Sequence, residues 1–215
     1  MAVVTFLTFN AFQENTYIVY DETGECIIFD PGCSDDYENN QLIDTLKKLN
    51  LKPVRLINTH CHIDHILGNK FVSDTFNLPL EIHEGELGML ERGPTVAAMY
   101  GIPYLNHSPI PSQFLNEKDE IIFGNSKLKI ILTPGHSPAS LSFYNEKNCF
   151  LIAGDVLFKD SIGRTDLPGC NHALLISSIK EKLFMLPEET VVWPGHGEST
   201  TIGYEKKNNP FVGII

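Results

Sequence analysis

The sequence predicts an α/β (α+β) protein in which two β-sheets pack together and helices cover their outer faces. Runs of β-branched and aromatic residues, typical of strands, alternate with segments of helical periodicity in both halves of the 215-residue chain. One strand plan occurs twice, at residues 131–136 and 191–196, where an apolar run ends in Pro-Gly and a histidine follows at once. The chain length suits one domain, so we expect a single domain over residues 1–215.

The first half is expected to begin with a hairpin and then to alternate strands with helices. Residues 21–24 (Asp-Glu-Thr-Gly) separate two apolar runs, as hairpin turns do. Leu42, Leu46 and Leu49 recur at the spacing of an amphipathic helix. The predicted strands are 3–9, 16–20, 26–29, 54–58 and 80–83, and the predicted helices are 37–49, 67–76 and 84–92.

Residues 93–114 interrupt this alternation. They contain four prolines and several apolar residues that we expect to be exposed, among them Met99, Tyr100 and Tyr104. A loop of this length is often functional. We therefore expect an inserted loop at 93–114, which is either a lid over the site or a separate packing patch.

The second half is expected to return to strands and to close with helices. Leu175, Ile179 and Leu183 predict a helix that ends before Pro187, and another helix is expected near 201–207. The predicted strands are 121–123, 128–132, 141–144, 149–152 and 191–193.

Composition limits the class of protein. A net charge of −11 and the lack of a basic stripe disfavour a nucleic-acid-binding surface. No apolar run approaches the roughly 20 residues of a membrane helix, and residues 1–12 lack the basic start of a signal peptide. The five cysteines form no Cys-x-x-Cys pair and fit reduced thiols. We expect a cytoplasmic protein without a membrane or nucleic-acid partner, and the sequence leaves its oligomeric state open.

Histidines and aspartates gather in short clusters that can bind metal. Residues 59–65 read Thr-His-Cys-His-Ile-Asp-His, and two Pro-Gly-His elements and one Gly-Asp element follow. Seven nitrogen and oxygen ligands are too many for one ion and suit two, so the pattern predicts a dinuclear metallohydrolase. The candidate ligands are His60, His62, Asp64, His65, His136, Asp155 and His196.

Spacing indicates how these ligands divide between two ions. His60 and His62 are two residues apart and project to the same side of an extended segment, whereas Asp64 and His65 are adjacent and cannot. Asp155 has two carboxylate oxygens and can bridge both ions. The expected sites are His60, His62 and His136 for one ion, Asp64, His65 and His196 for the other, with Asp155 between them.

The donor types also limit the metal and its surroundings. Imidazole and carboxylate ligands suit two zinc ions, with iron and manganese as alternatives. A ligand imidazole needs a partner for its second ring nitrogen, and Asp30 is either that partner or a turn residue. Cys61 is expected to point away from the ligands. The other histidines, His83, His107 and His172, lack partner spacing and are expected to be structural or at the surface.

At these residues the chain resembles the metallo-β-lactamase superfamily. The segment 59–65, Thr-Pro-Gly-His, Gly-Asp and Pro-Gly-His-Gly occur in the order of that family, so the resemblance covers essentially the whole chain. It implies a four-layer αββα sandwich with a binuclear site in the groove between the two sheets.

Two segments further resemble the glyoxalase II (hydroxyacylglutathione hydrolase) group. Residues 154–166 resemble that group, and residues 200–211 resemble its short bacterial type, which lacks the C-terminal helical domain. Arg164 matches a family lysine that contacts the glutathione carboxylate, whereas Asp166 stands where the family has a tyrosine. Asp155 at the bridging position differs from the cysteine ligand of some zinc β-lactamases.

The resemblance implies a metal-dependent hydrolase of small thioesters, such as an acyl-glutathione. A hydroxide shared by the metals would attack the thioester carbonyl, with Asp64 and Asp155 as catalytic residues. The leaving thiol has a pKa of about 8.5 and needs little help from an acid. Arg164 and Tyr100 are the candidate substrate-binding residues, and the expected partner is a small-molecule thioester.

Two other activities that occur on the same fold are alternatives. Persulfide dioxygenases resemble the chain at residues 59–62 and 163–166, and use one iron on positions that match His60, His136 and Asp155. Their last motif generally differs from the Pro-Gly-His-Gly of residues 194–197. Nucleases also occur in the superfamily, but the acidic composition disfavours that activity.

Overall fold

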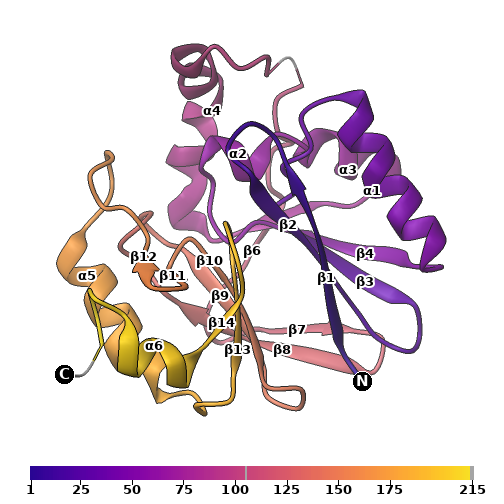
Figure 1. The fold of residues 1–215 in the computed structure, drawn as a ribbon. Coiled ribbons are helices and arrows are strands. Elements are labelled where there is room, and N and C mark those ends of the chain that lie inside the picture. The colour runs from indigo at the N-terminus through magenta and orange to yellow at the C-terminus, as the bar shows by residue number, and fades with distance from the viewer. Residues whose placement is uncertain (105, 214–215) are drawn as a thin grey trace. The chain divides into compact units, whose positions relative to one another are not determined.

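The computed structural model describes residues 1–104 and 106–213 and divides the chain into two compact units. The first unit comprises Met1–Leu115 and Ile122–Ser126, and the second comprises Asn116–Ile121 and Lys127–Ile215. Six-stranded sheets form the framework of both units (Figure 1). Leu105, within the expected 93–114 insert, lies outside the described residues.

The first sheet combines an antiparallel meander with parallel strands. β1, β2 and β3 pair antiparallel in sequence order, and β3, β4, β5 and β6 then pair parallel. The strands are β1 (Val3–Phe9), β2 (Glu14–Tyr20), β3 (Glu25–Phe29), β4 (Lys52–Ile57), β5 (Leu80–Ile82) and β6 (Gln113–Phe114). The predicted hairpin turn is confirmed between β2 and β3, where Gly24 adopts a φ of 81°.

Helices α1 (Asp36–Lys48) and α3 (Asn69–Phe76) belong to the core of the first unit (Figure 1). Asp35 caps α1 by accepting a hydrogen bond from the backbone N–H of Glu38 at 2.9 Å. Leu42 and Leu46 lie one turn apart on α1 and are buried in the same hydrophobic cluster as Leu56 of the sheet. The predicted helices at 37–49 and 67–76 are therefore confirmed to within two residues.

The expectation of an irregular segment beginning at residue 93 is wrong. Helix α4 runs from Leu87 to Tyr100, after the short 3₁₀ turn η1 (Glu84–Glu86), and includes Pro94. The proline ring clashes with the backbone N–H and the Cβ of the residue before it, and Gly93 has no Cβ. A Cβ at Gly93 would also lie 3.1 Å from Ile66 Cδ1, so glycine permits both the proline and close packing. Gly101, with a φ of 68°, ends the helix.

Two aromatic residues of this segment differ in exposure. Tyr100 is exposed as expected, and so is Met99. Tyr104 is buried, contrary to expectation, and its hydroxyl accepts the backbone N–H of Ser108 at 2.8 Å. Pairing of the phenol oxygen with Ser108 removes the cost of burying it, so Tyr104 belongs to the core.

The second sheet is mainly antiparallel, with one parallel pair. β10 pairs parallel with β13, and the register aligns Gly154 with Pro194. The strands, in sheet order, are β14 (Thr200–Thr201), β13 (Val191–Pro194), β10 (Phe150–Gly154), β9 (Leu141–Asn145), β8 (Ser126–Leu132) and β7 (Glu120–Phe123). A separate two-stranded hairpin joins β11 (Leu157–Phe158) and β12 (Ser161–Ile162).

Helical segments complete the core of the second unit. The predicted helix at 175–186 is a succession of α5 (His172–Ser177), a π turn η2 (Ser178–Lys182) and a 3₁₀ turn η3 (Leu183–Met185). Its apolar residues share a hydrophobic cluster with the sheet and with α6 (Ile202–Asn208). Within the described residues, none of the helices has both the length and the apolar character needed to cross a membrane.

Candidate metal centre

The first group of candidate ligands follows directly after β4. Residues 58–62 are irregular and lead into the short helix α2 (Ile63–Ile66), which carries Asp64 and His65. The Asn58 side chain closes this segment by donating to the carbonyl of His65 at 3.0 Å. The sequence thus brings a strand end and a helical turn together, and both His60 and His65 become fully buried.

Asp30 is the central acceptor of this group. Its Oδ1 accepts the backbone N–H of Thr59 at 2.6 Å, and its Oδ2 lies 3.2 Å from His65 Nδ1. Because a carboxylate oxygen accepts hydrogen bonds, the Nδ1 of His65 donates here, and Nε2 is the ring nitrogen that can bind a metal. Of the two alternatives for Asp30, a ligand partner or a turn residue, the structure shows the contact with a candidate ligand histidine.

Thr59 links Asp30 to a second candidate ligand, His60. Its hydroxyl donates to Asp30 Oδ2 at 2.6 Å, and its oxygen lies 3.0 Å from His60 Nδ1. Since the hydroxyl proton is used on Asp30, the oxygen accepts from His60 Nδ1–H, which again leaves Nε2 for a metal. One carboxylate therefore sets the tautomer of two imidazoles whose ring centroids are 4.2 Å apart.

Asp64 is held through its main chain. Asn10, from the turn between β1 and β2, donates its side-chain N–H to the Asp64 carbonyl at 2.9 Å. The Asp64 carboxylate Oδ2 lies 3.5 Å from His65 Nε2, which places these two donors within reach of one ion. Gly32 allows this approach, because a Cβ there would lie 2.8 Å from the Asp64 carbonyl oxygen.

Two further buried carboxylates surround the group. Glu14 Oε1 lies 3.9 Å from His65 Nδ1, and burial raises the pKa of Glu14 well above its ordinary value of 4.5, although His65 opposes the shift. Glu86 accepts the backbone N–H of Cys61 at 3.0 Å and so holds the chain between His60 and His62. Sequence reasoning missed both residues, because nothing in their local spacing relates them to the ligands.

Cys61 behaves as a core residue. It packs in the hydrophobic cluster of the first unit, and burial raises the pKa of its thiol well above the ordinary value. A metal takes the thiolate rather than the thiol, so this environment disfavours Cys61 as a ligand.

The second group of candidate ligands comes from three separate places in the second unit. His136 follows β8, Asp155 follows β10 and His196 follows β13. Asp155 Oδ2 lies 3.5 Å from His136 Nε2 and 3.5 Å from His196 Nε2. The parallel pairing of β10 with β13, and a 2.9 Å hydrogen bond from Gly195 N to the Gly154 carbonyl, bring Asp155 and His196 to the same sheet end.

A main-chain carbonyl sets the tautomer of His136. Its Nδ1 lies 2.9 Å from the carbonyl oxygen of Arg164, so Nδ1 donates and Nε2 is available to a metal. Gly163 permits this contact, because a Cβ there would meet the Asp155 carbonyl at 2.0 Å and His136 Nδ1 at 3.0 Å. Cys170 adds a 2.8 Å contact from its thiol to the His136 carbonyl.

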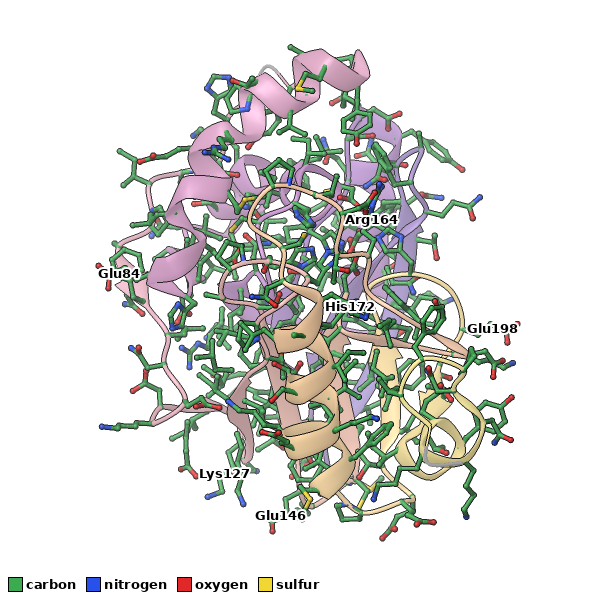
Figure 2. The ribbon with its side chains drawn as sticks, turned by 90° about the vertical axis from the view of Figure 1, so that its left-hand side faces the viewer. Glu84, Lys127, Glu146, Arg164, His172 and Glu198 are labelled. Atoms are coloured by element: carbon green, nitrogen blue, oxygen red, sulfur yellow. The ribbon has the colours of Figure 1, made fainter. Side chains whose placement is uncertain are left out.

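The two candidate substrate residues have different surroundings. Arg164, which is labelled in Figure 2, belongs to the second unit. It forms a bidentate ion pair with Asp166, with Nε–Oδ1 and Nη2–Oδ2 distances of 2.7 Å. This hydrogen-bonded pairing lowers the pKa of Asp166 to about 2. Tyr100 is exposed at the end of α4, and its ring packs edge-on against Phe12 at 5.6 Å.

The remaining histidines take structural or surface roles, as expected. His83 accepts the backbone N–H of Gly85 at 3.0 Å and so caps η1. His107 is exposed, with its ring 5.3 Å from that of Tyr104. His172 is exposed and its Nδ1 lies 3.1 Å from the Thr165 hydroxyl.

The fold and the paired imidazole and carboxylate groups are those of a metal-dependent hydrolase class. The chain matches the metallo-β-lactamase superfamily over residues 9–196 and belongs to that superfamily of metallo-hydrolases. This fold, with clusters of histidine and aspartate at its ligand positions, indicates a dinuclear metal site.

Among curated proteins, the chain is similar to relatives of nearly its own length. It is 38% identical to the "probable metallo-hydrolase YqgX" of Bacillus subtilis, over 93% of this chain and 92% of that protein. It is 32% identical to the hydroxyacylglutathione hydrolase GloC of Haemophilus influenzae, over 97% of both chains.

Solved structures confirm the expected fold class. The B3 metallo-β-lactamase BLEG-1 is 39% identical, with a TM-score of 0.89 over 98% of this chain and 99% of that one. TTHA1623, in a di-iron-bound form, is 34% identical, with a TM-score of 0.86 over 96% and 99%. ETHE1 from Myxococcus xanthus is 25% identical, with a TM-score of 0.78 over 98% and 84%.

Proposed function

We propose that this protein is a dinuclear metal-dependent hydrolase of small thioesters, over one domain of residues 1–215. The observation that carries the proposal is that three candidate ligand histidines share one arrangement of their Nδ1 atoms. His60, His65 and His136 each direct Nδ1 to an acceptor, which is Thr59, Asp30 or the carbonyl of Arg164. Each Nε2 is then available to a metal ion, as in the carboxylate–histidine–metal arrangement of metalloenzymes.

The proposed ligands divide as their spacing predicts. One ion would be held by His60, His62 and His136, the other by Asp64, His65 and His196, with Asp155 between them. The 3.5 Å distances from Asp155 Oδ2 to the Nε2 atoms of His136 and His196 support the bridging role. Imidazole and carboxylate donors suit two zinc ions, with iron and manganese as alternatives, and the di-iron-bound form of the relative TTHA1623 supports iron among these alternatives.

The bound metals would supply Lewis acidity, which brings the pKa of a water down to about 7 and polarises a carbonyl. The protein's own groups would position the reactants. Asp64 and Asp155 would orient the attacking water through their carboxylates and hold its proton. The carbon–sulfur bond then breaks, and products are a carboxylic acid and a thiol whose pKa of about 8.5 makes it a good leaving group.

The proposed substrate is an acyl-glutathione or a related small thioester. GloC, a hydroxyacylglutathione hydrolase that matches nearly the whole chain, supports this class. Arg164 would contact a carboxylate on the thiol carrier, and Tyr100 with Phe12 would contact its apolar part. We propose no nucleic-acid partner, since the net charge is −11.

Metal analysis combined with a thioester panel tests this proposal. We expect His60→Ala and Asp155→Ala to lose bound metal and thioesterase activity together, because each removes a ligand. His107→Ala, which changes an exposed histidine outside the ligand set, should keep both. Full turnover by a metal-depleted His60→Ala protein would overturn the mechanism.

An iron-dependent persulfide dioxygenase is the second candidate. The Arg164–Asp166 ion pair favours it, because both residues fall in the segment 163–166 that those enzymes share. One iron per chain, with oxygen uptake on glutathione persulfide, would support this reaction. Two zinc ions per chain with thioester hydrolysis would support the proposed thioester hydrolase.

A further inference from the structure

The hairpin of β11 and β12 adjoins all three candidate ligands of the second unit (Figure 1). It starts two residues after Asp155 and ends two residues before Arg164, whose carbonyl accepts His136 Nδ1 at 2.9 Å. Within the hairpin, the ring of Phe158 lies 6.4 Å from the ring of His196. The hairpin is therefore a common support for these three ligands.

The base of this hairpin packs closely beside the ligands. The backbone N–H of Gly163 donates to the Val156 carbonyl at 3.2 Å and so extends the pairing of the two strands. A Cβ at Gly163 would lie 3.0 Å from His136 Nδ1, and Val156 is fully buried. Because this packing leaves no free space, the hairpin cannot shift at this end without moving the groups next to it.

The tip of the hairpin is held by a buried carboxylate of α6. Glu205 is fully buried, and its oxygens accept the backbone N–H of Asp160, with the shorter distance at 3.2 Å. Asn209, at the end of α6, donates its side-chain N–H groups to Glu205 Oε2 at 2.7 Å and to the Ser161 carbonyl at 3.0 Å. Two successive residues of the hairpin are thus hydrogen-bonded to the helix.

The same carboxylate also binds the chain that follows His196. Glu205 Oε1 accepts the Thr200 hydroxyl at 2.5 Å. Thr200 lies in β14 and pairs with Val192 of β13, the strand that leads to His196. Since a buried carboxylate is costly without such donors, Glu205 holds together the segments that follow Asp155 and His196.

We propose that Glu205 is a positioning residue for the metal centre, because from α6 it fixes the hairpin that supports His136, Asp155 and His196. This inference rests on the proposed metal-dependent function. It also assigns a role to residues 200–211, none of which is a candidate ligand.

Metal affinity and the spectrum of a bound probe ion test this role. Glu205→Met keeps the length of the side chain but removes both acceptor oxygens, so the affinity for Zn²⁺ should fall about tenfold in chelator competition. The visible absorption of Co²⁺ bound in place of zinc should also change, because it depends on the geometry of the ligands. Glu205→Gln should stay close to wild type, since its oxygen can accept from Asn209 while its amide N–H donates to the Thr200 hydroxyl.

A destabilised variant separates this effect from a general loss of stability. Leu128 is fully buried near the start of β8, whereas His136 follows the end of that strand. Leu128→Ala should lower the Tm without changing the Zn²⁺ affinity or the Co²⁺ spectrum. If Glu205→Met does not fold, Thr200→Val and Thr200→Ser replace it. Only serine keeps the hydroxyl, so only the valine variant should bind Zn²⁺ more weakly, by about threefold.

Each outcome decides the role of Glu205. Wild-type affinity and spectrum in a folded Glu205→Met protein, or in Thr200→Val where that pair is used, would overturn it. Equal changes in Glu205→Met and Leu128→Ala would do the same. A wild type that binds neither ion would overturn the metal centre and this role together. If the wild type binds two ions per chain but hydrolyses no thioester, only the proposed reaction fails, and the affinities still decide the positioning role.

Discussion

The candidate ligands of the two units are held in different ways. In the first unit they come from one stretch of residues, 60–65, and side chains fix their imidazoles: Asp30 directly on His65, and Thr59 on His60. In the second unit they come from three strand ends, and the acceptor for His136 is the main-chain carbonyl of Arg164.

This difference has a consequence for mutation. A side-chain acceptor can be removed by one substitution, whereas a main-chain carbonyl can be lost only if the backbone moves. The first unit should therefore be sensitive to polar substitutions around its ligands, and the second to substitutions that change the spacing of its main chain.

The largest effect is expected for Asp30→Asn. Asparagine keeps the shape and tolerates the positive φ of 47° at this position, but its amide N–H cannot accept from Thr59 or His65. His65 then loses the acceptor for its Nδ1–H, and His60 loses the same support through Thr59. Metal affinity should therefore fall about 10–100-fold. Chelator competition measures it, with the exposed Asp74→Asn as control. Unchanged affinity would mean that Asp30 does not orient these histidines.

Gly163→Ala tests the main-chain arrangement of the second unit. The new Cβ would lie 2.0 Å from the Asp155 carbonyl, so the backbone must shift. We expect a loss of about 1–3 kcal/mol in stability and weaker metal binding. Gly88→Ala is the control, since no atom lies within 4 Å of its Cβ position. Thermal unfolding with and without metal would show whether the two variants differ, and equal behaviour would contradict the close approach at Gly163.

A smaller effect is expected for Glu86→Gln in the first unit. The neutral amide can still accept the Cys61 N–H, but it loses the charge that strengthens this hydrogen bond. The expected cost is about 1 kcal/mol in the unfolding free energy, with a modest fall in metal affinity. Glu84→Gln, an exposed glutamate of the same 3₁₀ turn, should change neither quantity. If both variants lost similar amounts of unfolding free energy and metal affinity, Glu86 would not have the proposed positioning role.

The smallest effect concerns Glu14 in the metal-free protein. Burial raises its pKa above the ordinary 4.5, so the folded state keeps a proton that the unfolded chain releases as pH rises. This contribution to stability is full below about pH 4.3 and is lost as pH rises through the folded pKa. Glu14→Gln mimics the neutral acid and should raise the Tm by a few degrees at pH 8 but not at pH 4. If the Tm of the wild type and of Glu14→Gln changed with pH in parallel, this would contradict the raised pKa of Glu14.

Local patterns predicted most elements but misjudged the segment around Pro94. Proline normally ends a helix, so the sequence predicts an irregular segment from residue 93, yet α4 continues to Tyr100. Gly93, just before the proline, lies close to Ile66, a residue far away in the chain, since a Cβ at Gly93 would be 3.1 Å from Ile66 Cδ1. The same limit applies to Tyr104, whose burial depends on the Ser108 backbone N–H.

The pattern of histidines and aspartates identified the superfamily without coordinates. These motifs are short. A strand end followed directly by a histidine can be identified from neighbouring residues in the sequence, without knowledge of residues far away in the chain. The superfamily match over residues 9–196 agrees with that interpretation.

The order of residue types thus determined the class of fold and the donor atoms available to a metal. Tertiary structure decided which acceptor orients each imidazole, because Asp30 is 35 residues from His65 and Arg164 is 28 residues from His136. It also decided that Arg164 is paired with Asp166. Such partners follow from how strands and turns meet in space, and hydrogen bonds act only over about 3 Å, so no spacing along the chain could specify them.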